Sequence, residues 1–145
     1  MVEYKIQPAG AKANGRIYED NLTAINAGGH LQLIAEIEVE KYVAGVIEAE
    51  GGGDHEAEYY RVQAIISRTY AWANLRRHEA EGFNLCDATH CQVYHGRPRH
   101  EPLTFLATQT TEDIVIVDDS IDLITAAFHS NCGGHTINSE DVWSK

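Results

Sequence analysis

Glu50 is the residue whose type and position most clearly suggest chemistry. Residues 39–50 (VEKYVAGVIEAE) have the periodicity of an amphipathic helix, and at about 100° per residue Glu50 falls into the apolar stripe that begins at Val39. Three glycines at 51–53 end this helix directly after it. Desolvation and the negative end of the helix dipole both favour the protonated form of a carboxyl group at such a place. Glu50 is therefore a candidate general acid.

A purely structural interpretation of this residue is also open. If the helix frays before its last residue, the side chain of Glu50 turns to solvent and has no special chemistry. Glu48 is the nearest rival carboxylate, but the same helical geometry directs it away from the valine stripe. The remainder of the chain has to decide between these interpretations.

A second group of residues has the composition of a metal site. Two thiols and two imidazoles lie in or beside a loop-like segment: His78, Cys86, His90 and Cys91. This donor set suits tetrahedral zinc, although the spacing of the two cysteines is wider than in a zinc-finger knuckle. The sequence therefore predicts a structural zinc site. A disulfide between Cys86 and Cys91 in an oxidising compartment, and reduced thiols beside incidental histidines, are the alternatives.

The fourth ligand and a third cluster remain open at this level. His95 or Cys132 could replace His78 in the ligand set. Cys132 belongs to the C-terminal segment HSNCGGH, whose paired glycines allow the backbone to approach an oxygen-rich ligand closely. A nucleophilic site made of Cys132 with His129 or His135 is a further alternative, but no acid that would orient the histidine is identifiable.

The composition limits the partners of the chain. Its 145 residues suit one domain, and a net charge of −11, from 22 acidic and 11 basic residues, argues against binding to nucleic acid or to an anionic membrane surface. No stretch approaches the roughly 20 apolar residues of a membrane span. The opening residues MVEYKIQPAG lack the apolar core of a signal peptide, so we expect a cytoplasmic protein or one that begins after an export signal. Three cysteines are an odd number, so one is not in an internal disulfide.

The elements that must position these clusters are two main helices, a third short helix and four strand-like runs. The first two strands are predicted at 16–27 and 31–38, joined as a hairpin through Gly28-Gly29-His30. A long second helix is predicted from about 55 to 78, with Asp54 as its N-cap, and we expect it to pack on a sheet.

The second half of the chain is predicted to be richer in loops. A short helix at 103–111 precedes a second hairpin, whose strands at 114–117 and 121–128 flank Asp118-Asp119-Ser120. Strands, then helices, then strands predict an α+β fold. We expect a single domain over 1–145, with β-hairpins packed with two main helices and a zinc-bearing loop.

With these clusters described, the chain resembles the SpoIID/LytB family, whose domain is that of stage II sporulation protein D. Four blocks carry the resemblance in the same order: residues 39–50, YRVQAIISRTYA at 60–71, FNLCDATHCQVY at 83–94, and AAFHSNCGGHTINSEDVW at 126–143. The chain ends at Lys145, just after the last block, where family members usually continue. We therefore expect a compact or truncated version of the domain.

The resemblance implies a periplasmic or cell-surface lytic transglycosylase that acts on peptidoglycan glycan strands stripped of their peptides. It implies that Glu50 is the catalytic acid and then base, and that cleavage between N-acetylmuramic acid (MurNAc) and N-acetylglucosamine (GlcNAc) leaves 1,6-anhydro ends. It also implies zinc at Cys86, His90 and Cys91, with His78 upstream. Five further residues match family positions and are expected to line the substrate groove: Gln63, Arg68, Tyr70, His129 and Ser130. Arg68 and Tyr70 have an alternative role as anchors of the second helix.

Two departures from the family pattern leave alternatives open. Glu50 is followed by three glycines where the family commonly has Met-Pro, so we expect a more mobile loop there, and Cys132 replaces a common serine.

The main alternative to an enzyme is a non-catalytic peptidoglycan-binding module that enhances a cell-wall amidase, because the same domain occurs in amidase enhancers. A small zinc-stabilised interaction domain is the third interpretation.

Overall fold

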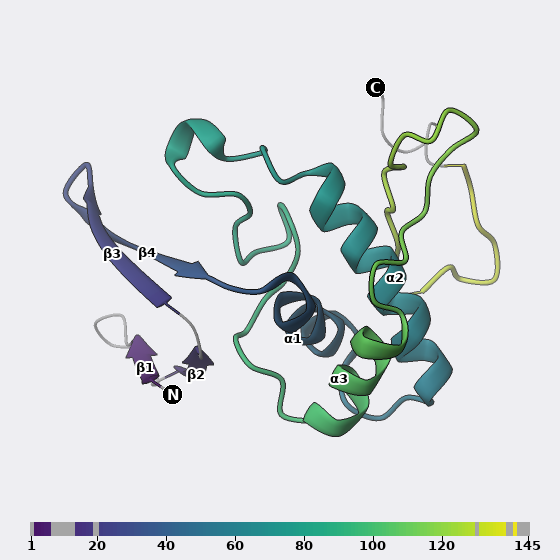
Figure 1. Ribbon diagram of the computed structural model, residues 1–145, viewed down its shortest axis with the longest axis horizontal. Helices are drawn as coiled ribbons and strands as arrows, with labels where there is room; N and C mark the ends of the chain where they lie inside the picture. The colour runs from purple at the N-terminus through teal and green to yellow at the C-terminus, as the bar shows by residue number, and fades with distance from the viewer. Residues whose placement is uncertain (1, 7–13, 19–20, 130, 139–140, 142–145) are drawn as a thin grey trace.

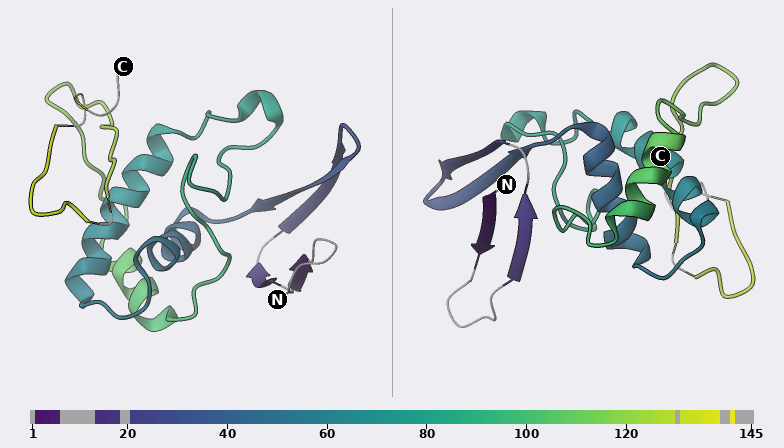
Figure 2. Two further views of the ribbon diagram at one scale, coloured as in Figure 1. Left: turned by 180° about the vertical axis from the view of Figure 1, so that it is seen from behind. Right: turned by 60° about the horizontal axis from the view of Figure 1, so that its bottom comes forward.

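The structure is a computed structural model, and it describes residues 2–6, 14–18, 21–129, 131–138 and 141. Two antiparallel β-hairpins lie at one end of the molecule and three α-helices form its body (Figure 1). The segment that follows the last helix runs along the opposite end from the hairpins, as both views of Figure 2 show. The predicted α+β class is confirmed.

The hairpins account for the first part of the chain. Strand β1 (Val2–Ile6) pairs with β2 (Asn14–Tyr18), and β3 (Asn21–Ala27) pairs with β4 (His30–Glu36) in a register that sets Ala27 opposite His30. Gly28 and Gly29 both have positive φ, as a two-residue hairpin turn requires. The predicted glycine turn is confirmed, but the single strand predicted at 16–27 is wrong, because β2 and β3 belong to different sheets.

Helix α1 (Val39–Gly51) follows β4 after two residues. Its middle, residues 43–47, is buried, and it ends at Gly52, whose φ of 83° suits glycine and whose N–H donates to the carbonyl oxygen of Glu48 at 2.8 Å. The helix therefore includes Glu50, and the interpretation in which it frays before that residue is wrong. The predicted boundary at 50 is confirmed to within one residue.

Helix α2 (Ala57–Ala73) is shorter than predicted. Its N-cap residue is Glu56, without a side-chain hydrogen bond, so the prediction of Asp54 as the cap is wrong. At its other end the side-chain amide of Asn74 donates to the carbonyl oxygen of Tyr70 at 2.8 Å, which occupies an acceptor at the helix end. His78 therefore lies outside α2, just before the short 3₁₀ helix Glu79–Glu81.

Helix α3 (Glu101–Thr110) completes a core made by the helices. The three helices pack against one another pairwise, and their shared core contains Val43, Ile47, Tyr60, Ala64 and Ala107. The prediction that α2 packs on a sheet is therefore wrong, because the surfaces that cover it belong to α1 and α3. This arrangement fixes the C-terminal end of α1, where Glu50 lies.

The second predicted hairpin is present only as a turn. Val117 and Leu123 form an isolated bridge, and Oδ1 of Asp118 accepts hydrogen bonds from the N–H groups of Ser120 and Asp122 at 2.8 and 3.0 Å. The prediction of two full strands at 114–117 and 121–128 is wrong for this part of the chain. The carboxylate of Asp118 closes the turn locally, while pairing does not extend along either side.

Candidate functional site

Glu50 lies half-buried in the last turn of α1. Its Oε1 accepts a hydrogen bond from the backbone N–H of Val93 at 2.8 Å. Among the described residues, the structure gives Oε2 no hydrogen-bond partner. One oxygen thus fixes the orientation of the carboxyl group, and the other is left for a ligand.

Glu48, the rival carboxylate, is engaged differently. Its Oε1 accepts from the N–H of Arg99 at 2.8 Å, and its Oε2 accepts from the N–H of His100 at 2.6 Å and lies 3.2 Å from Nδ1 of the same residue. Its side chain is 15% exposed. Because both oxygens hold the backbone of one segment, Glu48 acts as a structural anchor, which supports Glu50 as the residue available for chemistry.

The glycines after Glu50 are held by contacts from α2, from His55 just before it, and from the segment before α3. Nε2 of His55 donates to the carbonyl oxygen of Gly51 at 2.6 Å, and the hydroxyl of Tyr60 donates to that of Gly52 at 2.9 Å. A Cβ at Gly53 would overlap the ring of His100, so the backbone passes directly against that ring. These contacts oppose the expectation that the loop is mobile.

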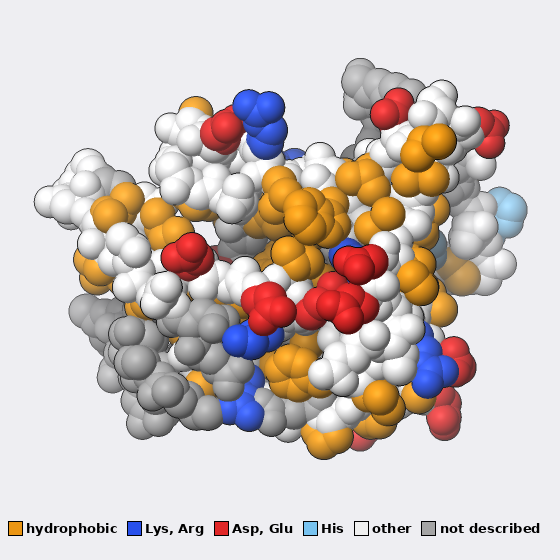
Figure 3. Space-filling model, viewed as in Figure 1, with side chains coloured by type: hydrophobic (Ala, Val, Ile, Leu, Met, Phe, Trp, Pro, Cys, Tyr) orange, Lys and Arg blue, Asp and Glu red, His pale blue; other side chains and the backbone are white. Residues whose placement is uncertain are grey.

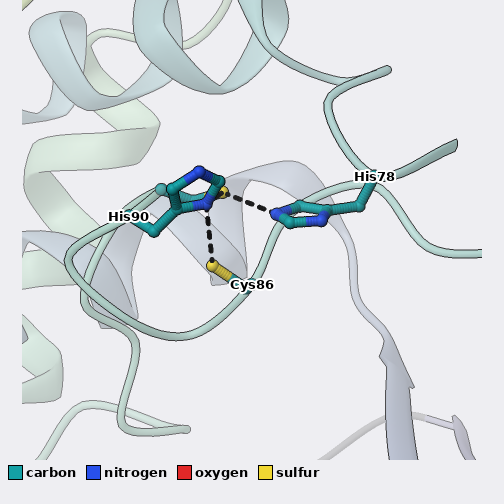
Figure 4. Close-up of side chains that lie close together, drawn as sticks. His78, Cys86 and His90 are labelled. Atoms are coloured by element: carbon teal, nitrogen blue, oxygen red, sulfur yellow. Dashed lines mark hydrogen bonds between the residues drawn. The ribbon is translucent and has the colours of Figure 1, made fainter. Parts of the chain in front are cut away.

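The predicted metal ligands come together in space. The ligating atoms of His78, Cys86, His90 and Cys91 all lie within 4.8 Å of one another. Nε2 of His78 lies 3.4 Å from Sγ of Cys91, and Nδ1 of His90 lies 3.8 and 3.7 Å from the sulfurs of Cys86 and Cys91 (Figure 4). All three cysteines of the chain are free.

The cluster has the geometry and the surroundings that a tetrahedral metal needs. Zinc bonds of about 2.0–2.3 Å correspond to ligand–ligand separations of roughly 3.5 Å, close to the three distances above. Nδ1 of His78 lies 2.7 Å from Oε1 of Glu81, and an ionised carboxylate only accepts, so Nδ1 carries the ring proton and Nε2 is left to ligate. The ring of Phe83 stacks on His78 at 4.6 Å between centroids. The residues present therefore fit a metal ion.

The electrostatics of the two thiols also suit a metal site. Burial alone would raise the pKa of the Cys86 thiol, but hydrogen bonds from the backbone of Ala88 and from the side chains of His90, Cys91 and His78 outweigh it and lower that pKa to about 6. Burial raises the pKa of the neighbouring Cys91 thiol. At neutral pH the pair therefore carries a thiolate on Cys86, which is the form that binds metal.

The loop that carries the cluster continues directly to the partner of Glu50. Val93, whose N–H holds the carboxylate, is two residues after Cys91. Between them, the side-chain amide of Gln92 donates to the carbonyl oxygen of Ser67 at 3.2 Å and its oxygen accepts from the hydroxyl of Tyr42 at 3.2 Å. Burial raises the pKa of Tyr42, so that hydroxyl stays protonated and donates. The loop is thus fastened to α1 and α2 between the cluster and Glu50.

The residues expected to line a substrate groove fall into different environments. Arg68 is 1% exposed, forms a two-point ion pair with Glu40 at 2.8 and 2.6 Å, and donates to the carbonyl oxygens of Thr108 and Ile114. These contacts support its alternative role as an anchor. The hydroxyl of Tyr70 accepts a hydrogen bond from Arg77 at 3.0 Å.

The other expected groove residues, and Cys132 as a substitute ligand, belong to α2 and to the C-terminal segment. Gln63 is half-buried on α2 beside Tyr59, and its Oε1 has no hydrogen-bond partner among the described residues. His129 is exposed, and Ser130 lies outside the described residues. Cys132 is exposed, with its sulfur accepting from the N–H of Gly134 at 3.3 Å, and the structure does not bring it into the metal cluster.

A pocket on the Glu48 side of α1 was not predicted from the sequence. It has a volume of about 350 Å³, and its charged and imidazole side chains are Arg16, Glu48, His95, Arg97, Arg99 and His100. Three of the chain's 11 Lys and Arg residues therefore meet in one place. The clustering of basic residues at 95–100 (HGRPRH) was the available signal, but the sequence does not show that Arg16 joins them.

The comparisons with known proteins decide the family. Residues 27–117 match the SpoIID family, described as "Stage II sporulation protein". The chain belongs to the SpoIID family. This matched range contains α1, α2, α3 and the complete metal cluster, so the SpoIID assignment covers both Glu50 and the loop that holds it. Family membership supports a function related to the cell wall.

Two relatives of this SpoIID chain are curated proteins of greater length. One is an uncharacterised protein of Brachyspira hyodysenteriae, 29% identical over 92% of the chain and 36% of its own length. The other is the amidase enhancer of Bacillus subtilis, 32% identical over 69% of the chain and 13% of its own length. The chain therefore spans about a third and about an eighth of these two relatives. No solved structure matches the chain. Within the described residues, every helix is too short or too polar to cross a membrane.

Proposed function

We propose that this SpoIID domain is a lytic transglycosylase that cleaves the MurNAc–GlcNAc bond of peptide-stripped peptidoglycan strands outside the cytoplasm. The observation that carries the proposal is the half-buried carboxyl group of Glu50, with one oxygen fixed by Val93 and the other left without a partner among the described residues. A group held in this way can give a proton to a substrate oxygen and later accept one from another direction.

The reaction would use this one carboxyl group twice. Protonated Glu50 donates its proton to the glycosidic oxygen, the bond between that oxygen and C1 of the muramic acid breaks, and positive charge develops at C1. The C6 hydroxyl of the same sugar then attacks C1 and gives its proton to the Glu50 carboxylate. The products are a 1,6-anhydro end and a new GlcNAc end, and the protonated Glu50 is restored without consumption of water.

The other residues would position this group. His78, Cys86, His90 and Cys91 would hold zinc, which when bound would cross-link the loop that presents the N–H of Val93. Glu48 fixes the far end of the same loop at Arg99 and His100. Gln63, Tyr70, His129 and Ser130 remain candidates for contacts with the glycan.

A second candidate function is a non-catalytic module that binds glycan strands and enhances a cell-wall amidase. The observation in its favour is the similarity to the Bacillus subtilis amidase enhancer. In that case Glu50 would contribute to glycan binding, and its replacement would change affinity without any reaction to abolish.

Peptide-free glycan strands incubated with the parent chain and with Glu50→Gln separate the two functions. The transglycosylase predicts soluble fragments from the parent and a loss of at least about 100-fold in rate for the variant, since an amide cannot transfer the proton. Glu112→Gln, at an exposed glutamate two residues after α3, is the matched control and should keep full activity. If the parent binds the strands and releases no fragments, the binding module is the correct function.

A further inference from the structure

The basic pocket beside Glu48 is not used by the reaction proposed above. Its cations come from two places far apart in the chain, Arg16 on β2 and the segment 95–100 that leads into α3. On the face drawn in Figure 3, Lys and Arg side chains gather beside and below α1, over that segment. The chain as a whole carries a net charge of −11, whereas the lining of this pocket is rich in arginine.

Arginines outnumber carboxylates among the side chains that line the pocket. Glu48 contributes one carboxylate, but both of its oxygens already accept backbone N–H groups. Nη1 of Arg16 lies 2.5 Å from Oδ2 of Asp87, whereas its Nε is buried and has no hydrogen-bond partner among the described residues. A buried guanidinium N–H without an acceptor is unfavourable, and an anion in the pocket could satisfy it.

Glycines let the segments around the pocket pack closely against their neighbours. Gly45, Gly52, Gly53 and Gly96 all line it. At Gly53 a Cβ would overlap the His100 ring, and at Gly96, where φ is 88°, it would overlap the carbonyl oxygen of Ile17. The volume of about 350 Å³ lies within the range of roughly 300–1,000 Å³ that small-molecule pockets occupy, so it can admit a sugar-sized ligand.

The pocket adjoins the proposed catalytic residue along the chain. Ala49 and Gly52, which flank Glu50 and Gly51, are part of its lining. The segment 93–100 begins at Val93, which donates to Glu50, and ends at Arg99 and His100, which line the pocket. A ligand in the pocket would therefore contact the same helix end and the same loop as a substrate at Glu50.

From this geometry we infer that the pocket binds a carboxylate carried by the glycan, namely the lactyl carboxylate of a muramic acid that has lost its peptide. This inference rests on the proposed function for its ligand. In a peptide-bearing strand the lactyl group is an amide without charge at that position, so the arginines would favour peptide-stripped strands. The specificity would then come from Arg16, Arg97 and Arg99, and not from Glu50.

Calorimetric titration of the intact chain with monosaccharides tests this inference without any turnover. MurNAc, which carries the lactyl carboxylate, should bind at least about tenfold more tightly than GlcNAc, which lacks it. Arg99→Gln keeps the N–H that bonds to Glu48 and should weaken MurNAc binding by about tenfold. Arg61→Gln, an equal change of charge on α2, is the control and should have no effect. Raising the salt concentration from about 50 to about 500 mM should weaken the binding of MurNAc and leave the binding of GlcNAc unchanged.

Three results would overturn the inference. They are equal affinity for the two sugars, unchanged MurNAc binding in both Arg99→Gln and Arg97→Gln, and tighter binding of D-alanyl-D-alanine than of MurNAc, which would assign the pocket to the end of a peptide stem. Repeating the titration with Glu50→Gln separates this inference from the proposed function. If that variant and the parent bind MurNAc through the arginines while the parent cleaves no glycan, the pocket stands and the enzymatic proposal fails.

Discussion

The backbone N–H of Val93 donates a 2.8 Å hydrogen bond to Oε1 of Glu50, across 43 residues of the chain. Because Val93 follows Cys91 by two residues, this bond joins the end of α1 to the loop of the metal cluster. The orientation of the proposed catalytic carboxyl group therefore depends on the fold of a loop with little regular structure.

Removal of one metal ligand should disturb both stability and catalysis. Cys86→Ser should lose bound metal, lower the midpoint of thermal unfolding by about 10 °C, and reduce glycan cleavage, because the loop that holds Glu50 loses its cross-link. Metal content by mass spectrometry and unfolding by circular dichroism are the measurements. Cys132→Ser, at an exposed cysteine outside the cluster, should keep the metal and the unfolding midpoint. Full metal content in Cys86→Ser would refute the assigned ligand set.

The two glutamates at the end of α1 should separate stability from activity. Glu48→Gln should lower the free energy of unfolding by about 1–3 kcal/mol, because an amide is a poorer acceptor for the N–H groups of Arg99 and His100 than a carboxylate. Glu50→Gln should remove activity but lower the free energy of unfolding by less than about 1 kcal/mol, since an amide oxygen can still accept from the N–H of Val93. Urea unfolding of both variants, beside a cleavage assay, tests this. The reverse pattern would make Glu48 the catalytic residue.

The buried pair of Arg68 and Glu40 should stabilise the packing of the helices. Arg68→Ala should lower the free energy of unfolding by about 3–5 kcal/mol, because it leaves the Glu40 carboxylate and two carbonyl oxygens without their donor. Arg61→Ala breaks the exposed ion pair with Glu58 on the same helix and should change the free energy of unfolding by no more than about 1 kcal/mol. Similar losses in urea unfolding for the two variants would show that Arg68 is not a structural anchor.

Gly45 should be required for the contact between α1 and the loop. An alanine inside a helix normally stabilises it by about 1 kcal/mol relative to glycine. Here the added Cβ would meet the ring of Tyr94 and would lie 2.6 Å from the carbonyl oxygen of Gly96. Gly45→Ala should therefore destabilise the fold by about 1–3 kcal/mol. A higher unfolding midpoint for this variant would mean that the loop does not pack against α1 as described.

The parts of the fold that depend on local sequence could be predicted from it. Consecutive glycines at 28 and 29 predicted the β3–β4 turn, and the valine periodicity with residues 51–53 predicted α1 and its end. The ligands His78, Cys86, His90 and Cys91 lie close together in the chain, so their composition was sufficient to group them. The end of α2 was placed too far along, because the hydrogen bond from Asn74 to Tyr70 is a local contact that leaves no periodic pattern in the sequence.

The features that depend on distant segments could not be predicted. The bond from Val93 to Glu50, the anchoring of Glu48 and the meeting of Arg16 with residues 95–100 each require the fold. The prediction of a sheet under α2 failed for the same reason, since an apolar helix face does not specify whether a strand or another helix covers it. The helical periodicity likewise could not show which of Glu48 and Glu50 has a carboxylate oxygen without a hydrogen-bond partner among the described residues.

The most direct test of the central claim is mass spectrometry of the fragments that the intact chain releases from peptide-free glycan strands. A transglycosylase that uses Glu50 should give muramic ends that are one water lighter than hydrolysed ends, formed by the parent chain and absent with Glu50→Gln. Muramic ends formed by hydrolysis, or 1,6-anhydro ends that persist in the Glu50→Gln variant, would contradict the proposed mechanism.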